Sequence, residues 1–199
     1  MSGEMSRSLK LLLVVQLFQG FRGGIISPIL ALFIRRQGVS VTQLGLLGTA
    51  GMMGWLIFEP LSGVIADRVK KKWMLAFGVM VSTVIYALYP MAGEIWHFGL
   101  LAFAMSSVMS FYAISAKSLI AELLPTSGRG RAYGRYLAAI SVGGIAGPFV
   151  GGYMADALGY SLPFYLSAAV GLISLGGILL LKYDGVAQET SGESSESGG

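Results

Sequence analysis

The stretch GVIADRVKKK, residues 63–72, places an acid and a run of bases directly after an apolar segment. The charges that follow Ile65 are Asp67, Arg68 and the lysines at 70–72. Hydrophobic residues make up 54% of the chain and charged residues only 12%, whereas a soluble domain carries about 25% charged residues. In such a chain, a charge cluster next to an apolar segment indicates the end of a membrane span.

The rest of the chain divides into apolar segments of the same kind. A helix needs about 20 apolar residues to cross a hydrocarbon core about 30 Å thick, and it satisfies its own backbone hydrogen bonds in lipid. We therefore predict an all-α membrane protein with a six-transmembrane-helix bundle over residues 9–183. The predicted spans are Leu9–Phe33, Leu44–Ala66, Trp73–Ala92, Phe98–Leu123, Tyr133–Ala157 and Pro163–Leu181.

The segments outside the spans have simple expected roles. Residues 1–8 form a short N-terminal segment, and the apolar run after them is longer than the apolar region of about 7–15 residues in a secretory signal. Ser161 is placed to cap the sixth helix. Residues 184–199 are rich in Gly, Ser and Glu, which is typical of a disordered tail or linker.

Basic residues are distributed unevenly between the two ends of the predicted helices. By the positive-inside rule, the richer end is cytoplasmic, which predicts a multi-pass protein of the cell membrane with both termini in the cytoplasm. The bases lie at span ends rather than in one patch, which argues against a nucleic-acid partner. The richer end carries Arg7, Lys10, Arg68, Lys70, Lys71, Lys72, Arg129, Arg131, Arg135 and Lys182, and the other end carries Arg35 and Arg36.

Enzymatic chemistry finds little support in the sequence. The chain contains no cysteine and a single histidine, His97, which falls in a predicted turn. Neither metal-ligand spacing nor a Ser–His pair is visible. We therefore expect no catalytic residue, no metal site and no cofactor.

Two motifs and one looser match resemble signatures of the major facilitator superfamily of transporters. GVIADRVKKK is similar to the family's loop motif between the second and third helices, although Lys70 stands where the family usually has glycine, which suggests a less tight turn. GGIAGPFVGG, residues 143–152, fits the fifth-helix pattern GxxxGPxxGG, and residues 121–134 resemble the loop that precedes that helix. The residues that match the first motif are Gly63, Asp67, Arg68, Lys71 and Lys72.

The resemblance implies a cytoplasmic gate at the first motif. Asp67 would face a helix N-terminus of an opposite half of the transporter. Arg68 and Glu122 would add a charge network between the second and fourth helices. These residues are expected to latch a conformation rather than to bind a solute.

The fifth-helix motif has a physical interpretation of its own. Gly143, Gly147 and Gly151 recur every four residues and share one face, where another helix can approach closely. Pro148 removes a backbone donor and favours a bend, and Gly152 completes the motif. Two interpretations remain open: a packing seam alone, or, as the resemblance implies for antiporter members, an interface between two halves whose kink influences gating.

Three charged residues fall inside predicted spans, where charges are expensive and usually face a cavity or a partner. Arg22 lies near mid-membrane, so we predict that it faces a central cavity and favours an anionic solute. Glu59 and Lys117 lie at similar depths near the cytoplasmic side, which suggests an ion pair or a shared hydrogen-bond network. Snorkelling to the surface is the alternative for Lys117.

The functional prediction follows from the resemblance. Family members consist of two six-helix halves around a central site, and the six predicted spans correspond to one half. This implies secondary transport of a small organic solute by alternating access, with a second half supplied by another copy or by a separately encoded chain. Glu59 is the only carboxylate well inside a span, so proton coupling stays open. The alternative is a truncated or non-transporting membrane interaction module.

Overall fold

A computed structural model describes residues 2–123 and 129–181 as six long helices. Each of the six is long and apolar enough to cross a membrane, so the six predicted spans are confirmed. Within the described ranges there is no strand. The helices are α1 (Ser2–Arg36), α2 (Val41–Arg68), α3 (Lys71–Leu88), α4 (Ile95–Leu123), α5 (Arg129–Leu158) and α6 (Leu162–Leu179), with a 3₁₀ helix η1 (Tyr89–Met91) after α3. The predicted tail, residues 184–199, lies outside the described residues.

Local chemistry explains where α2 begins. Gly38 has a φ of 84°, a left-handed conformation that glycine adopts without strain. The hydroxyl of Ser40 then accepts a hydrogen bond from the backbone N–H of Gln43, and the Gln43 side chain accepts one from the Ser40 N–H. This capping box fixes the first turn of α2. Ser161 occupies the corresponding position before α6 but makes no capping hydrogen bond through its side chain, so that prediction is wrong.

The turn between α2 and α3 is tight. Only Val69 and Lys70 separate the two helices. Lys70 has a φ of −57° and a ψ of 118°, a conformation that needs no glycine. The looser turn suggested by Lys70 is therefore not observed.

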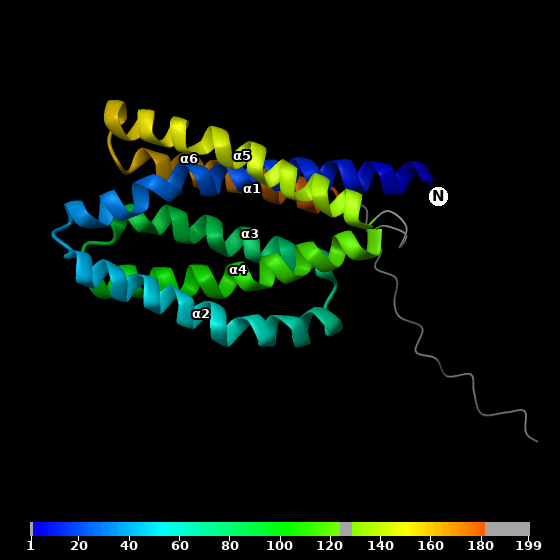
Figure 1. Cartoon of the computed structure of the whole chain (residues 1–199), viewed down its shortest axis with the longest axis horizontal. Coiled ribbons are helices and arrows are strands. Elements are labelled where there is room, and N and C mark those ends of the chain that lie inside the picture. Colours follow the sequence, from blue (N-terminus) through cyan, green and yellow to red (C-terminus); the bar gives the residue numbers. More distant parts are fainter. Residues whose placement is uncertain (1, 124–128, 182–199) are drawn as a thin grey trace, which may run out of the picture.

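The packing of the first three helices is repeated, in the same order, by the last three. α1 packs along α5 and α6, α4 packs along α2 and α3, and α3 packs against α6. Figure 1 shows the two groups, with α1, α5 and α6 above α2, α3 and α4. Exchanging the first three helices with the last three leaves the pairing unchanged. That is the arrangement of two three-helix repeats of inverted topology, which the sequence itself does not reveal.

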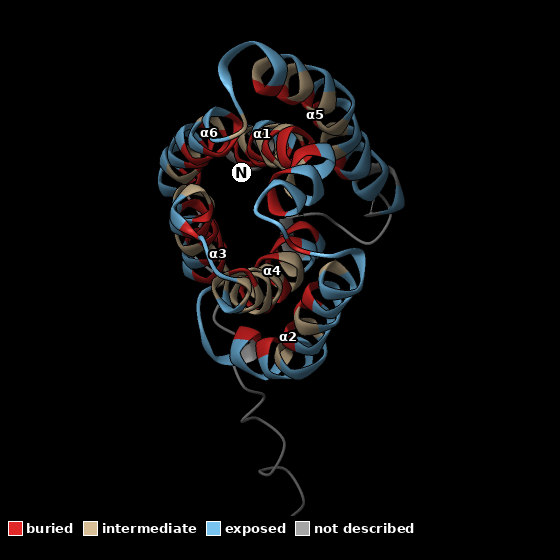
Figure 2. Cartoon of the chain, turned by 90° about the vertical axis from the view of Figure 1, so that its left-hand side faces the viewer, coloured by how far each residue is buried: buried red, intermediate tan, exposed pale blue. Residues whose placement is uncertain are grey.

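One side of the bundle is far more exposed than the other. In the end-on view of Figure 2, α3 and α6 lie on one side of the ring and α2 and α5 on the other. Only 17% of the apolar window of α2 and of α5 is buried, against 50% for α3 and 44% for α6. Met52 of α2 and Phe149 of α5 are among the most exposed large side chains. The α2–α5 side therefore needs an apolar neighbour, either lipid or another helical unit.

The buried core contains a polar layer between two apolar clusters. One cluster includes Leu12, Leu75 and Ile178, and the other includes Ile25 and Phe164. Along α1, α3 and α6, six buried polar residues fall between the members of these two clusters. They are Gln16 and Arg22 of α1, Ser82 and Thr83 of α3, and Ser167 and Ser174 of α6.

Candidate functional site

Arg22 lies in the polar layer and is only 2% exposed. Its Cζ atom is 4.8 Å from the centre of the Tyr86 ring of α3, and its Nη1 donates a hydrogen bond of 3.2 Å to Oε1 of Gln19. On α6, Gly171 leaves the necessary room, because a Cβ atom there would lie 3.0 Å from Cζ of Arg22. Residues of three helices thus position the guanidinium.

A cavity of about 190 Å³ adjoins Arg22 and is lined by residues of α1, α3, α4 and α5. Tyr112 of α4 donates a hydrogen bond of 2.7 Å to Oε1 of Gln16. The lining residues are Gln16, Gln19, Gly20, Arg22, Gly23, Ser82, Tyr86, Met109, Tyr112 and Ile140, and none of them is acidic. Four buried nitrogens have no hydrogen-bond acceptor among the described residues: Nε and Nη2 of Arg22, and Nε2 of Gln16 and of Gln19. Because arginine keeps its charge in proteins, this cavity is rich in donors and positively charged.

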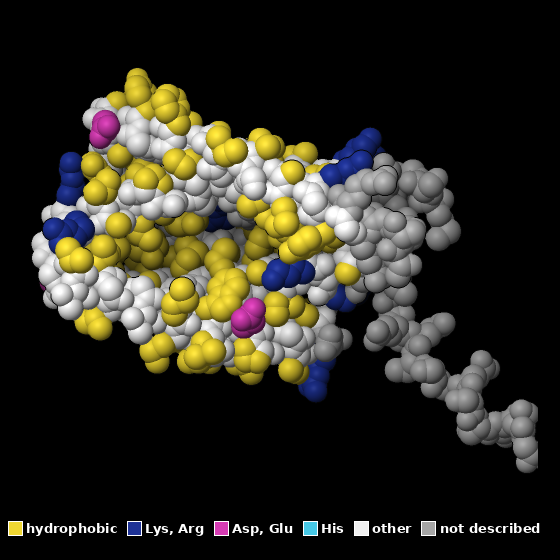
Figure 3. All heavy atoms as spheres, viewed as in Figure 1, with side chains coloured by type: hydrophobic (Ala, Val, Ile, Leu, Met, Phe, Trp, Pro, Cys, Tyr) yellow, Lys and Arg dark blue, Asp and Glu magenta, His cyan; other side chains and the backbone are white. Residues whose placement is uncertain are grey.

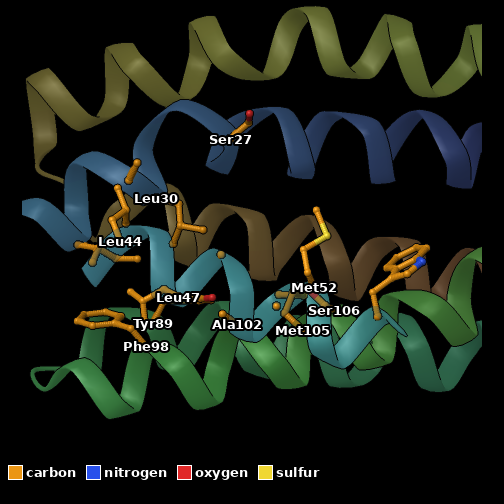
Figure 4. A pocket seen from close by; sticks show the side chains of 15 residues that line it. Ser27, Leu30, Leu44, Leu47, Met52, Tyr89, Phe98, Ala102, Met105 and Ser106 are labelled. Atoms are coloured by element: carbon orange, nitrogen blue, oxygen red, sulfur yellow. The ribbon is translucent and has the colours of Figure 1, made fainter. Parts of the chain in front are cut away.

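A larger apolar groove of about 630 Å³ lies between α1, α2 and α4. Figure 3 shows that the face with α2 and α5 is hollowed and that hydrophobic side chains line the hollow. In Figure 4, Leu30 of α1 and Met52 of α2 reach into the space between the helices. Phe98 and Met105 of α4 also line the groove, and the hydroxyl of Ser106 adds a polar group. Sequence reasoning missed this groove because its apolar residues come from three helices and look like ordinary span residues.

The cavity and the groove follow one another along the same two helices. On α1, Gly23 lines the cavity and Ser27 lines the groove. These residues are one turn apart, about 6 Å along the helix axis. On α4, Met109 lines the cavity and Met105 lines the groove. A charged site and an apolar site therefore lie in sequence along the seam between α1 and α4.

The predicted pairing of Glu59 with Lys117 is not formed. Both residues are exposed, and Glu59 accepts a hydrogen bond of 3.0 Å from Nε1 of Trp55, one turn earlier on α2. No hydrogen bond or ion pair between these two side chains is found among the described residues. Similar depth along two helices was therefore not enough to bring the two charges into contact.

The fifth-helix glycines form a seam within this bundle. A Cβ atom on Gly143, Gly147 or Gly151 would collide with the backbone of α1. A Cβ atom on Gly24 of α1 would lie 3.0 Å from Cδ of Pro148. The predicted close approach is confirmed, and its partner is α1. Gly152 has no atom within 4 Å of the position of a Cβ, so it does not take part in the seam.

The gate motif is only partly described. Lys72 donates hydrogen bonds of 2.8 Å and 2.6 Å to the carbonyl oxygens of Leu179 and Leu181, and so it satisfies free carbonyls at the end of α6. Arg68 is exposed, and a Cβ atom on Gly63 would have no neighbour within 4 Å. The side chains of Asp67 and Glu122 lie outside the part that the structure describes. Residues 124–128, within the looser family match at residues 121–134, also lie outside it.

Comparisons with known proteins agree with this architecture. The chain is 28% identical over 174 residues to the quinolone resistance protein NorA of Staphylococcus aureus, covering 85% of this chain and 43% of NorA. It is 27% identical over 180 residues to multidrug resistance protein 2 of Bacillus subtilis, covering 88% and 44%. Its fold is similar to a crystal structure of a bacterial homologue of the human lysosomal transporter Spinster, with a TM-score of 0.75, 17% identity, and coverage of 92% and 44%.

The chain thus spans less than half the length of the curated relatives it matches. A family model described as Major Facilitator Superfamily matches residues 12–198, which is nearly the whole chain and includes most of α1 and all of α2–α6. The chain is a multi-pass membrane protein that belongs to the Major Facilitator Superfamily.

Proposed function

We propose that the chain is one six-helix unit of a transporter that moves a small organic solute by alternating access. The observation that carries this proposal is the apolar groove on the open α2–α5 side of the bundle. Its volume, about 630 Å³, falls within the range of about 300–1,000 Å³ that is typical of pockets for small molecules. The names of the relatives, quinolone resistance and multidrug resistance, favour an apolar organic solute rather than an inorganic ion.

The proposal includes a second six-helix unit that covers the α2–α5 side. Ile145 and Phe149 of α5 are 78% and 80% exposed, and a second unit would bury such side chains. Another copy of this chain can supply it, because two copies with the same orientation give two parallel halves. A separately encoded six-helix half is the other source.

The remaining site residues keep narrower roles. Glu59 of α2 and Lys117 of α4 lie on two of the helices that line the groove, so each is proposed singly as a charged residue near the solute path. The first motif, with Asp67 and Arg68, is proposed as a latch at a cytoplasmic end, where Lys72 already ties α3 to α6. The proposal places both termini in the cytoplasm and the bundle in the cell membrane, and it assigns no coupling ion.

Flux measurements on a matched pair of glycine variants test the proposal. Gly48 lines the groove and Gly45 does not, although both belong to α2 and neither has an atom within 4 Å of the position of a Cβ. Gly48→Leu places a side chain in the groove without a backbone collision. We expect wild-type protein and Gly45→Leu to transport fluorescent aromatic solutes in proteoliposomes, and Gly48→Leu to lose most of that flux.

The mass of the protein in nanodiscs should be measured on the same preparations. A two-copy particle that transports none of the solutes would contradict the transport proposal and favour the non-transporting interaction module. If Gly48→Leu and Gly45→Leu retain equal flux, the solute does not pass through the groove.

A further inference from the structure

We propose that the Arg22 cavity binds the acidic group of an amphipathic organic anion whose apolar part lies in the adjoining groove. This inference rests on the proposed function only in taking the ligand to be a transported solute. The binding step itself requires no flux. The inference goes beyond the proposed function by assigning the acidic group of the solute to a binding site at Arg22.

Donors outnumber acceptors around the cavity. Arg22 is a permanent cation, and burying a charge without a partner costs several kcal/mol. Nε and Nη2 of Arg22 and Nε2 of Gln16 are buried without an acceptor among the described residues, while both side chains are at most 2% exposed. A carboxylate offers two oxygens that accept several such bonds and also supplies the missing negative charge.

The surrounding contacts hold the guanidinium of Arg22 in place but do not neutralise it. Tyr86 contributes the face of its ring, and Gln19 contributes one neutral acceptor. Gly171 makes the space that the guanidinium occupies. Neutral groups from three helices therefore position the charge. The guanidinium remains without a negatively charged partner, which a bound anion would supply.

The sizes of the two spaces suit different parts of one ligand. The cavity of about 190 Å³ is smaller than the range of about 300 Å³ and above that holds whole drug-sized molecules. It has room for an acidic group or a small ion. The groove of about 630 Å³ is large enough for an aromatic body but is mainly apolar.

The two spaces are also close enough for one ligand to reach both. Gly23 lines the cavity and Ser27 lines the groove, and they are separated by about 6 Å of helix. A solute with an acid attached directly to an aromatic body spans such a distance. The geometry therefore favours an aryl carboxylate over an inorganic anion, which would leave the groove unused.

Equilibrium binding to the purified full chain in nanodiscs tests the inference, with empty nanodiscs as the background. The probes are biphenylcarboxylate, its neutral isostere biphenylcarboxamide, and acetate, which has the acid without the apolar body. We expect biphenylcarboxylate to bind at least about tenfold more tightly than either of the others, as a charge-assisted contact and an apolar contact would each supply that factor.

Two variants change the cavity in different ways. Arg22→Met removes the charge at similar length and also removes the cost of burying it, so the variant is expected to fold. Gly23→Val keeps Arg22 and fills part of the cavity, because no atom lies within 4 Å of a Cβ at Gly23. Each variant should lower the affinity for biphenylcarboxylate at least about tenfold and leave the affinity for biphenylcarboxamide unchanged. Gly176→Val on α6 is the matched control, since that position is also open and lines neither space.

The outcomes separate this inference from the proposed function. Equal affinity for the carboxylate and the carboxamide, or unchanged carboxylate affinity in both cavity variants, would overturn it. Acetate binding as tightly as biphenylcarboxylate would also overturn it, by showing a site for a small anion alone. Selective binding without flux would support the anion site and contradict transport. Flux of neutral solutes without selective binding would support transport and contradict the anion site.

Discussion

The α1–α5 and α2–α4 contacts occupy equivalent places in the inverted repeat, yet they are built differently. At the α1–α5 contact, glycines come from both helices. A Cβ on Gly20 of α1 would collide with the backbone of α5, and a Cβ on Gly147 of α5 would collide with the backbone of α1. At the α2–α4 contact, the closely packed glycines are on α2, and part of what they meet is side chain, whereas Gly99 of α4 makes only an ordinary contact with Leu47. A Cβ on Gly51 would lie 3.1 Å from Oγ of Ser106.

This difference separates a fixed pair of helices from an adjustable one. Where backbone packs against backbone, no atom can rotate out of the way, whereas a serine side chain can change rotamer and move its hydroxyl. Both spaces are lined by α1 and α4, but α2 lines only the groove and α5 lines only the Arg22 cavity. We infer that the charged site is held on the rigid contact and that the apolar groove has the more adaptable wall.

The largest expected effect is that of Gly147→Ala. Its Cβ would collide with the carbonyl oxygen of Phe21 and lie 2.6 Å from the backbone nitrogen of Ile25, so α1 and α5 must separate. We expect a loss of stability of roughly 3 kcal/mol or more, at the upper end for overpacking, seen as a lower melting temperature in detergent. Gly152→Ala is the control on the same helix and should be neutral or slightly stabilising. Equal melting temperatures for the two variants would show that the seam is not fixed.

Gly54→Ala should have an intermediate effect. Its Cβ would lie 2.5 Å from the carbonyl oxygen of Phe103 and 2.8 Å from Oγ of Ser107, of which only the hydroxyl can rotate. We expect a cost of roughly 2 kcal/mol, measured in the same melting experiment. Adding Ser107→Ala should recover part of this loss, and no recovery would contradict the adjustable character of the contact.

Gly51→Ala should have the smallest effect. The nearest atom to its Cβ is the rotatable Oγ of Ser106, at 3.1 Å, and alanine is favoured over glycine in a helix by about 1 kcal/mol. The cost of the close contact and the gain in helix propensity nearly cancel, so we expect a melting temperature close to that of the wild type. A loss as large as that of Gly147→Ala would remove the distinction between the two contacts.

The sequence predicted the features that depend on position along one helix. Apolar length located six spans, the spacing of Gly143, Gly147 and Gly151 indicated one close-packed face, and the depth of Arg22 placed it within the bundle. Each of these follows from the period or the rise of a helix. Membership of the family followed from motifs of the same local kind.

The features that the sequence did not predict depend on how helices face one another. Similar depth suggested that Glu59 and Lys117 form an ion pair or share a hydrogen-bond network, but both residues are exposed and Glu59 is bonded to Trp55 instead. Nothing in the sequence linked Arg22 to Tyr86 of α3 or to Gly171 of α6. The groove was invisible for the same reason, since its wall is assembled from three helices whose rotation about their axes is set only by packing.

Cysteine accessibility gives the most direct test of the claim that the α2–α5 side encloses a solute path. The chain has no cysteine, so single substitutions are unambiguous. Met52 lines the groove and Leu172 lies on α6, and both are well exposed in the isolated bundle. We predict that Met52→Cys in intact membranes reacts with a water-soluble maleimide and is protected by biphenylcarboxylate, whereas Leu172→Cys stays unlabelled. If Met52→Cys is as unreactive as Leu172→Cys, lipid covers the groove, which contradicts an enclosed solute path.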